Sequence, residues 1–191
     1  MIFFPFGLVA LAALAGYQVE MLRNVRDGLA VPLPRWENFG QKINQGVGVL
    51  IAGALYNLPN IAWLCLSFSG AFSDWGGVLG AGLCCLTPAL LLVNLLIIPL
   101  QAVGMIRFAE SGRVESFFRF GDLFDVIRAH ASLVLVWAVW MLLANFVIWG
   151  IGSVIPCLGW LAIGALATPV QAHLLGQLAA QLGYHKPKNV C

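Results

Sequence analysis

The sequence predicts an all-α fold: a polytopic membrane helical bundle with about five transmembrane helices and two interfacial amphipathic helices. Hydrophobic residues make up 61% of the 191 residues, and charged residues only 9%. Such a balance does not suit a soluble domain. The Lys and Arg residues are also confined to three clusters, and the stretches between the clusters are almost entirely apolar. These observations place the chain in a lipid bilayer.

The basic clusters determine where the predicted spans begin and end. They comprise Arg23, Arg26, Arg35 and Lys42; Arg107, Arg113, Arg119 and Arg128; and Lys186 and Lys188. Each crossing needs about 20 helical residues. The longest uncharged stretch must therefore fold back, and its Gly-rich and Pro-containing segment 150–159 is the natural place for a turn. The predicted spans are 2–22, 45–68, 76–104, 130–151 and 157–182.

The same clusters set the direction of the spans. Lys and Arg gather in the loops that stay on the cytoplasmic side of a membrane. The prediction therefore puts the N-terminus outside and the C-terminus in the cytoplasm, and neither of the two outer loops contains Lys or Arg. The bilayer is the first predicted partner. A net charge of +2, without basic residues grouped on a soluble face, gives no reason to expect nucleic acid.

Two short aromatic segments, which follow the predicted spans 2–22 and 76–104, are predicted to be the interfacial amphipathic helices. Their aromatic or apolar residues recur at i, i+3 and i+7, which places these residues on one face of a helix. The two sets are Trp36, Phe39 and Ile43, and Phe117, Phe120 and Phe124. Such a face lies in the headgroup plane more readily than it crosses the membrane. Trp36, Phe39, Phe117 and Phe120 are the predicted interfacial anchors.

These two segments also suggest an internal repeat within a single membrane domain, 1–191. All three aromatic or apolar pairs are 81 residues apart, and so are Gly40 and Gly121. The repeat units would be 1–70 and 82–152, with a fifth span, 157–183, outside the pair. The alternative is that interfacial helices resemble one another because few residue types suit the membrane boundary.

Polar side chains near the middle of the predicted spans are the first candidate ligand-binding residues. Asn60 and Asn94 stand out, because prolines at 59, 88 and 99 are predicted to interrupt the same helices. Broken helices with polar groups at mid-depth are typical of transporter substrate sites. The alternative, which we favour, is that these amides hydrogen-bond neighbouring helices together. No charged residue falls at mid-depth, which argues against an ion or proton path.

Histidine is the residue type to weigh for a cofactor. His173 lies within the fifth span, where it could ligate a haem or a chlorophyll-type pigment. The alternative is a structural histidine that bonds a neighbouring helix together with Gln177, four residues further on. We favour the structural interpretation, so the sequence predicts no cofactor. The five cysteines show no metal-ligand spacing, and no metal site is predicted.

Enzyme activity finds no support in the sequence. It has no Ser, His and Asp grouping, no phosphate-binding loop and no helix-borne zinc motif. The carboxylates on the predicted inner side lie among arginines, where charged residues usually form a solvated network. We therefore expect a protein without catalytic activity of its own.

The segments around the basic clusters are specific enough to compare. The first reads GYQVEMLRNVRDG from Gly16 and continues with PLPRWENFGQKINQGVGVLIAGALYNLP through Pro59. The others are FRFGDLFDVIRAH from Phe118 and AHLLGQL from Ala172. They resemble an uncharacterised family of prokaryotic membrane proteins, domain of unknown function 4013. The resemblance implies a topology and a prokaryotic membrane location, and it carries no activity, substrate or catalytic residue.

The shared residues have physical interpretations. Pro34 presets the turn before the first amphipathic helix, and Gly46 is expected to let the chain bend from the membrane plane into the second span. Ala172 and Gly176, four residues apart, are expected to let a neighbouring helix approach closely.

Three functional hypotheses follow. The first is a structural or accessory subunit, or an assembly partner, of a larger respiratory or photosynthetic membrane complex, in contact with other membrane protein subunits. It is based on the absence of intramembrane charge and on the small-residue contact faces. The second is a transporter or channel for a small uncharged or lipid-like solute. The third is a haem- or pigment-binding membrane subunit that uses His173.

Overall fold

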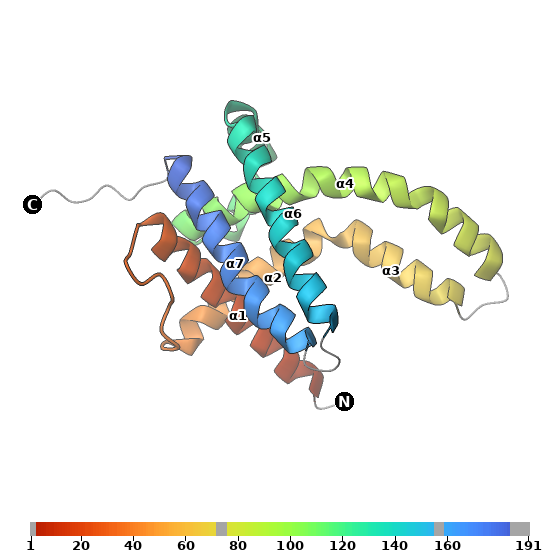
Figure 1. The fold of residues 1–191 in the computed structure, drawn as a ribbon, viewed down its shortest axis with the longest axis horizontal. Coiled ribbons are helices and arrows are strands. Elements are labelled where there is room, and N and C mark those ends of the chain that lie inside the picture. Colours follow the sequence, from red (N-terminus) through yellow and green to blue (C-terminus); the bar gives the residue numbers. More distant parts are fainter. Residues whose placement is uncertain (1–2, 72–75, 155–158, 184–191) are drawn as a thin grey trace, which may run out of the picture.

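A computed structural model describes the backbone of residues 3–71, 76–154 and 159–183, and the side chains of 7–68, 86–154, 163 and 166–183. Its described part is all-α, as predicted, with seven α-helices, one short 3-10 helix and no strand (Figure 1). The helices are α1 (Phe3–Arg26), α2 (Phe39–Tyr56), α3 (Leu58–Ala71), α4 (Gly76–Ser111), α5 (Phe120–Ala129), α6 (Ala131–Val154) and α7 (Gly159–Gln181). The 3-10 helix, η1 (Val114–Phe117), lies between α4 and α5.

Two glycines end the helices that lead to the basic clusters. Gly28 follows α1 and Gly112 follows α4, with φ angles of 69° and 67°. This left-handed conformation is strained for residues with a Cβ and is the common way for a helix to stop. The Gly112 amide donates a hydrogen bond of 2.8 Å to the Phe108 carbonyl. α4 therefore ends at Ser111, directly before Gly112.

Two helices in the described part are long and apolar enough to cross a membrane, namely Leu86–Ser111 of α4 and Ala131–Val154, which is α6. A third crossing is added if α2 and the Leu58–Phe68 part of α3 form one bent span. Over their described residues, α1 and α7 do not meet the same test. These helices are consistent with a membrane protein, but the predicted count of five spans is not confirmed.

The predicted second span, 45–68, is broken. It divides into α2 and α3, whose axes differ by 64° across Asn57. The bend does not occur at Gly46, where it was expected, because α2 continues through that position. Gly46 instead lies against α1, where an added Cβ would come within 1.7 Å of the Ala12 carbonyl oxygen. Its absent side chain allows close helix packing rather than a bend.

The first predicted amphipathic helix is also absent. Residues 27–38 form turns and extended chain, and α2 begins only at Phe39, so Trp36 does not share a helix with Phe39 and Ile43. Pro32 and Pro34 lie in this segment, and each removes a backbone donor that a helix would use.

The second amphipathic helix exists in a shorter form than predicted. It is α5, with Leu123 fully buried and the rings of Phe120 and Phe124 exposed. Phe117 ends η1 instead of sharing this helix. The three phenylalanines therefore do not form one helical face. Phe39 and Phe120 each begin a helix, but nothing in the fold tests whether the two halves arose by duplication.

Small residues bring α1 into close contact with two helices. α1 packs against α2 and α7. An added Cβ at Gly16 would come within 1.9 Å of the Lys42 carbonyl oxygen in α2. At Gly176 in α7 it would meet the Val25 Cβ at 2.5 Å, and nearby Ala172 is fully buried. The expectation that Ala172 and Gly176 admit a close neighbour is confirmed.

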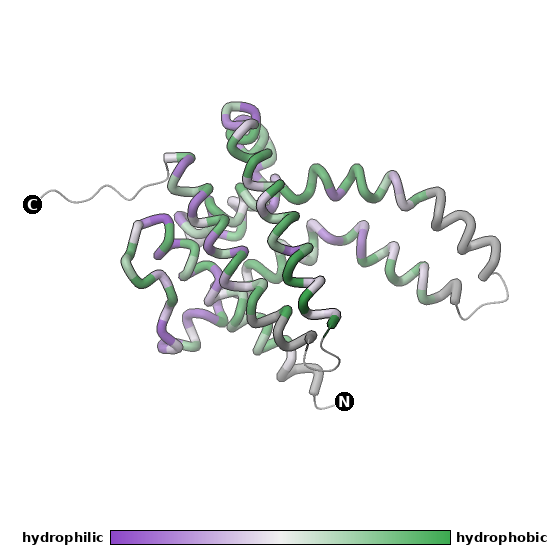
Figure 2. The backbone as a smooth tube through the Cα atoms, viewed as in Figure 1, coloured by the Kyte–Doolittle hydropathy of each residue, from purple (hydrophilic) through white to green (hydrophobic). Residues whose placement is uncertain are grey.

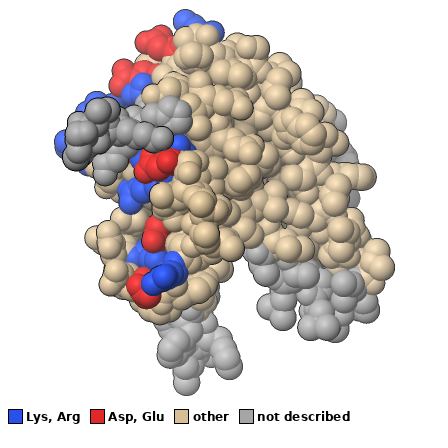
Figure 3. All heavy atoms as spheres, turned by 60° about the vertical axis from the view of Figure 1, so that its left-hand side comes forward, with Lys and Arg blue, Asp and Glu red and all other residues tan. Residues whose placement is uncertain are grey.

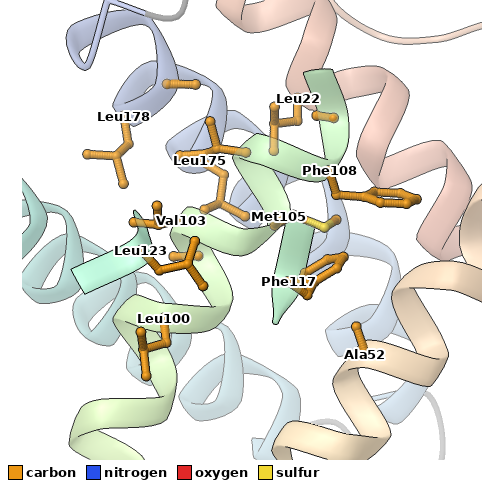
Figure 4. Packing of buried hydrophobic residues seen from close by; sticks show 14 of the residues in the cluster. Leu22, Ala52, Leu100, Val103, Met105, Phe108, Phe117, Leu123, Leu175 and Leu178 are labelled. Carbon is orange, nitrogen blue, oxygen red and sulfur yellow. The ribbon is translucent and has the colours of Figure 1, made fainter. Parts of the chain in front are cut away.

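The buried core lies where α4 approaches its end, and the other helices meet around it (Figure 4). α4 contributes Leu100, Val103, Met105 and Phe108, and Leu22, Phe117, Leu123 and Leu175 surround them. We call this set the core. Beyond it, α3 and the first part of α4 leave the bundle together (Figure 1). Residues 58–68 and 86–98 are called the α3–α4 arm below.

Prolines do not interrupt α4, contrary to the sequence prediction. Pro88 and Pro99 lie inside one continuous helix of 36 residues. A proline removes one backbone hydrogen bond, a loss that neighbouring groups can offset in membrane helices. In the described helices, a break occurs beside Pro59, between α2 and α3. α7 also continues through its internal proline.

Candidate functional site

The amides predicted as ligand-binding residues bind each other. Asn60 of α3 donates to the Asn94 side-chain oxygen of α4 at 2.8 Å, and Asn94 donates back to that of Asn60 at 2.9 Å. Asn94 also donates to the Leu90 carbonyl at 3.0 Å, and Asn60 to the Asn57 side-chain oxygen at 3.1 Å. All four amide protons of the pair thus have acceptors inside the protein. The arrangement holds the two helices of the arm together.

A second amide contact joins α6 and α7. Gln171 donates to the side-chain oxygen of Asn145 at 3.2 Å, and Asn145 donates to the Met141 carbonyl at 2.8 Å. Polar pairs of this kind contribute about 0.6 kcal/mol each on average in membrane bundles. The contact has the geometry of a hydrogen bond that joins helices.

His173 and Gln177 are adjacent on an exposed face of α7. The two side-chain nitrogens lie 3.0 Å apart, so the ring nitrogen Nε2 is engaged by the glutamine amide. Among the described residues, no group of three or more His, Cys, Asp or Glu is arranged to hold a metal ion. Neither finding tests the haem or pigment hypothesis.

The four predicted anchors occupy different environments. Trp36 and Phe39 are each 51% exposed, and Trp36 stacks on Tyr17 at 4.8 Å between ring centroids. Phe120 is 46% exposed. Phe117 is only 1% exposed, and its ring packs on Phe108 at 5.4 Å. Phe117 is therefore a core residue rather than one that faces the headgroups.

The charged side chains gather on one side of the molecule, where α1 and α4 end and α2 and α5 begin (Figure 3). We call this side the charged end; the hydropathy of the chain shows the same separation (Figure 2). The Arg23 Nε donates to the Ala109 carbonyl at 2.5 Å, and the Arg26 guanidinium lies 3.9 Å from the Glu110 carboxylate. These contacts join the ends of α1 and α4.

Lys42 is a buried cation that sequence reasoning missed. Its side chain is 4% exposed and forms an ion pair with Glu20 of α1. Lys42 appeared to be an ordinary member of a basic cluster, but it lies one helical turn into α2, on the side that faces α1. The pair ties the start of α2 to α1, since an unpaired buried ammonium would be costly.

Tyr56 is the second residue whose role the sequence did not predict. Its hydroxyl donates to the Phe117 carbonyl at 2.5 Å, and its ring stacks on Phe118 at 6.1 Å. The signal was the residue type itself, because a tyrosine in an apolar span needs a partner for its hydroxyl. The partner could not be identified, since it lies 61 residues away.

Several cavities occur in the described part of the chain, and two that open at the charged end have mostly polar or charged lining residues. The first, about 390 Å³, lies between α1 and α2; its charged lining residues are Glu20, Arg23, Arg35, Glu37 and Lys42. The second, about 550 Å³, lies around the end of α4 and η1; its charged lining residues are Arg107, Glu110, Arg113, Glu115 and Arg119. Each contains three cations and two carboxylates. The geometry suits binding of a polar or anionic group.

Comparisons with known proteins give a family and nothing further. The model of a family described as "Protein of unknown function (DUF4013)" matches residues 1–157. No curated protein matches the chain, and no solved structure matches it.

Proposed function

The chain belongs to the DUF4013 family of proteins of unknown function, and we propose that it is a structural or accessory subunit of a larger membrane complex. It would have no catalytic activity of its own. The observation that carries the proposal is the closed pairing of Asn60 with Asn94. A subunit that only holds its helices together uses its buried amides in this way, whereas a solute site needs polar groups that remain free for the solute.

The proposal includes a topology. α1, the bent α2–α3 pair, α4, α6 and α7 are the five proposed spans of the prokaryotic cytoplasmic membrane, with the N-terminus outside. The contacts of Arg23 and Lys42 support it, because they bring the ends of separate helices to a single charged end. Basic residues on one side of a bundle favour the cytoplasmic face.

The α3–α4 arm is the proposed surface for a partner subunit. Leu92 and Leu95 of α4 are 68% and 71% exposed, and Leu64 of α3 is 55% exposed. α3 makes its contacts with α4 and α2. Helices in membranes associate through packing and interhelical hydrogen bonds, and the arm has an uncovered length on which a neighbour can pack. Lipid is the other occupant that such a surface admits.

Purification from the native membrane in mild detergent tests the proposal. We expect a complex with fixed stoichiometry, whose mass by native mass spectrometry includes at least one different chain. The absorbance spectrum of the same sample tests the haem or pigment hypothesis. That hypothesis requires a visible absorption band that disappears in the variant His173→Leu. An isolated chain that crosses the membrane without any partner would contradict the accessory role.

A transporter for a small uncharged or lipid-like solute is the second candidate, and one observation favours it. The 64° break at Asn57 lies beside the Asn60–Asn94 pair, and discontinuous helices with nearby polar groups are typical of transporter sites. Uptake of solutes into vesicles that contain the protein would test it. The double variant Asn60→Leu, Asn94→Leu should abolish uptake if these amides bind the solute. Unchanged uptake would exclude this site.

A further inference from the structure

The second cavity at the charged end differs from the first in how its cations are used. In the first cavity, Lys42 is paired with Glu20, and the Arg23 Nε is bound to the Ala109 carbonyl. Arg35 lies 4.0 Å from Glu37, but both side chains are largely exposed, so this pair is weak. Two of the three cations of the first cavity are thus bound within the protein, and only Arg35, on the open side, remains available to a ligand.

In the second cavity, the cations are only partly engaged. Arg113 and Glu115 form a pair at 2.8 Å, but both side chains are about two-thirds exposed, so the pair is weak. Arg119 has no ion pair among the described residues. Arg107 binds Asp122 at 3.1 Å, yet its Nε is buried with no hydrogen-bond partner in the described part of the chain. Arg119 is therefore the cation of this cavity that has no ion pair among the described residues, whereas the buried Arg107 Nε is out of reach and Arg107 adds positive charge through its partly exposed guanidinium.

The position of the cavity favours a ligand that belongs to the membrane boundary. It lies at the end of Leu86–Ser111, which is long and apolar enough to cross a bilayer. Arg119 is flanked in sequence by Phe118 and Phe120, which are 36% and 46% exposed. The Phe118 ring stacks on Tyr56, and the Phe120 ring meets Tyr56 edge-on. Cationic groups beside exposed rings match the two parts of a phospholipid, a phosphate and an acyl chain.

We propose that this cavity binds the phosphate of an anionic phospholipid headgroup through Arg119 and Arg107, with the acyl chains against the rings of Phe118 and Phe120. Arginine suits this role because its planar guanidinium can bind two phosphate oxygens at once. Free phosphate shares this chemistry but does not use the aromatic rings. The proposal rests on the membrane placement proposed above and is independent of the accessory role.

Native mass spectrometry of the full-length protein in detergent tests the site. The protein is titrated with phosphatidylglycerol and, separately, with phosphatidylcholine that has the same acyl chains. We expect preferential binding of phosphatidylglycerol, and Arg119→Gln should weaken it about ten-fold, because it removes the charged hydrogen-bond donors that contact the phosphate. Arg128→Gln is the matched control, since Arg128 lies in the last turn of α5, the helix that begins directly after Arg119, but does not line the cavity. It should change binding less than two-fold.

Three results would overturn the proposal. The first is equal binding of the two lipids. The second is equal loss of binding in Arg119→Gln and Arg128→Gln, which would indicate general surface charge rather than a site. The third is displacement of phosphatidylglycerol by millimolar inorganic phosphate, which would assign the site to the free ion. Equal melting temperatures of the lipid-free variants would show that Arg119→Gln has not unfolded the protein.

Discussion

The core and the α3–α4 arm share one helix and differ in how it is covered. In α4, Val103 and Ile106 are fully buried, and helices from both ends of the chain surround them. In the same helix, Leu92 and Leu95 are more than two-thirds exposed. The sequence is strongly apolar in both parts. Apolar character therefore makes the helix suited to cross a membrane but does not determine which part of it packs within the protein.

Glycine and ring contacts explain the difference between the two regions. At the core, Gly104 leaves room for the Phe117 ring, and Gly48 lies against Phe108 and Val114. Missing side chains on one element admit large side chains from another, so three or more elements can meet there. In the arm, α3 and α4 are joined mainly by the Asn60–Asn94 pair and by contacts between the two helices themselves. The core is therefore filled by the chain's own side chains, while the outer sides of the arm are exposed and open to lipid or a partner.

The largest expected effect comes from emptying the core. Phe117→Ala should reduce the free energy of unfolding by about 3 kcal/mol or more, because it removes a fully buried ring and leaves a cavity. Phe68→Ala in the arm is the control, since Phe68 is 60% exposed and should cost less than about 0.5 kcal/mol. Unfolding in detergent with increasing denaturant measures both. Similar losses for the two variants would refute the contrast between core and arm.

A smaller effect is expected from the contact between α1 and α2. Gly46→Ala should destabilise the protein by about 1–3 kcal/mol, because its Cβ would overlap the Ala12 carbonyl and force the helices apart. Gly40→Ala is the control in the same helix, as nothing lies within 4 Å of that position. It should be neutral or stabilising. Thermal unfolding of both variants separates close packing from helix propensity, and a neutral Gly46→Ala would contradict the packing.

The smallest effect is expected from the amide pair in the arm. A double-mutant cycle with Asn60→Leu and Asn94→Leu should give a coupling energy of about 0.6 kcal/mol. The losses of stability in the two single variants should add up to more than the loss in the double variant. The reason is that each single variant leaves one amide without its partner. Reversible unfolding in detergent measures the four proteins. Additive effects would mean that the hydrogen bonds do not hold the arm together.

The positions of the helices were easier to predict from the sequence than the contacts that each helix makes. The apolar runs of α4 and α6, and the stop at Gly112, could be predicted because composition and a single glycine determine them. A break beside Pro59 was expected, but the continuity of α2 through Gly46 could not be predicted, because a glycine is compatible with a bend and with a close contact. Only the position of α1 decides between the two.

The candidate site shows the same limit. Asn60 and Asn94 were identified as mid-span polar residues, but periodicity cannot show that they face each other from two helices. Phe117 was expected at the membrane surface because its spacing from Phe120 fits a helix. η1 ends between them and turns Phe117 into the core. Four residues of 3-10 geometry change the face on which a side chain lies.

Site-specific photocrosslinking in the native membrane tests the account most directly. A photoreactive residue at Leu95 in the arm is compared with one at Leu142 in α6, because both positions are 71% exposed. We predict one protein adduct of constant mass from Leu95, repeated at Leu92, and labelling of lipid alone from Leu142. Labelling of lipid alone from all three positions would contradict the claim that the α3–α4 arm is the surface on which a partner subunit packs.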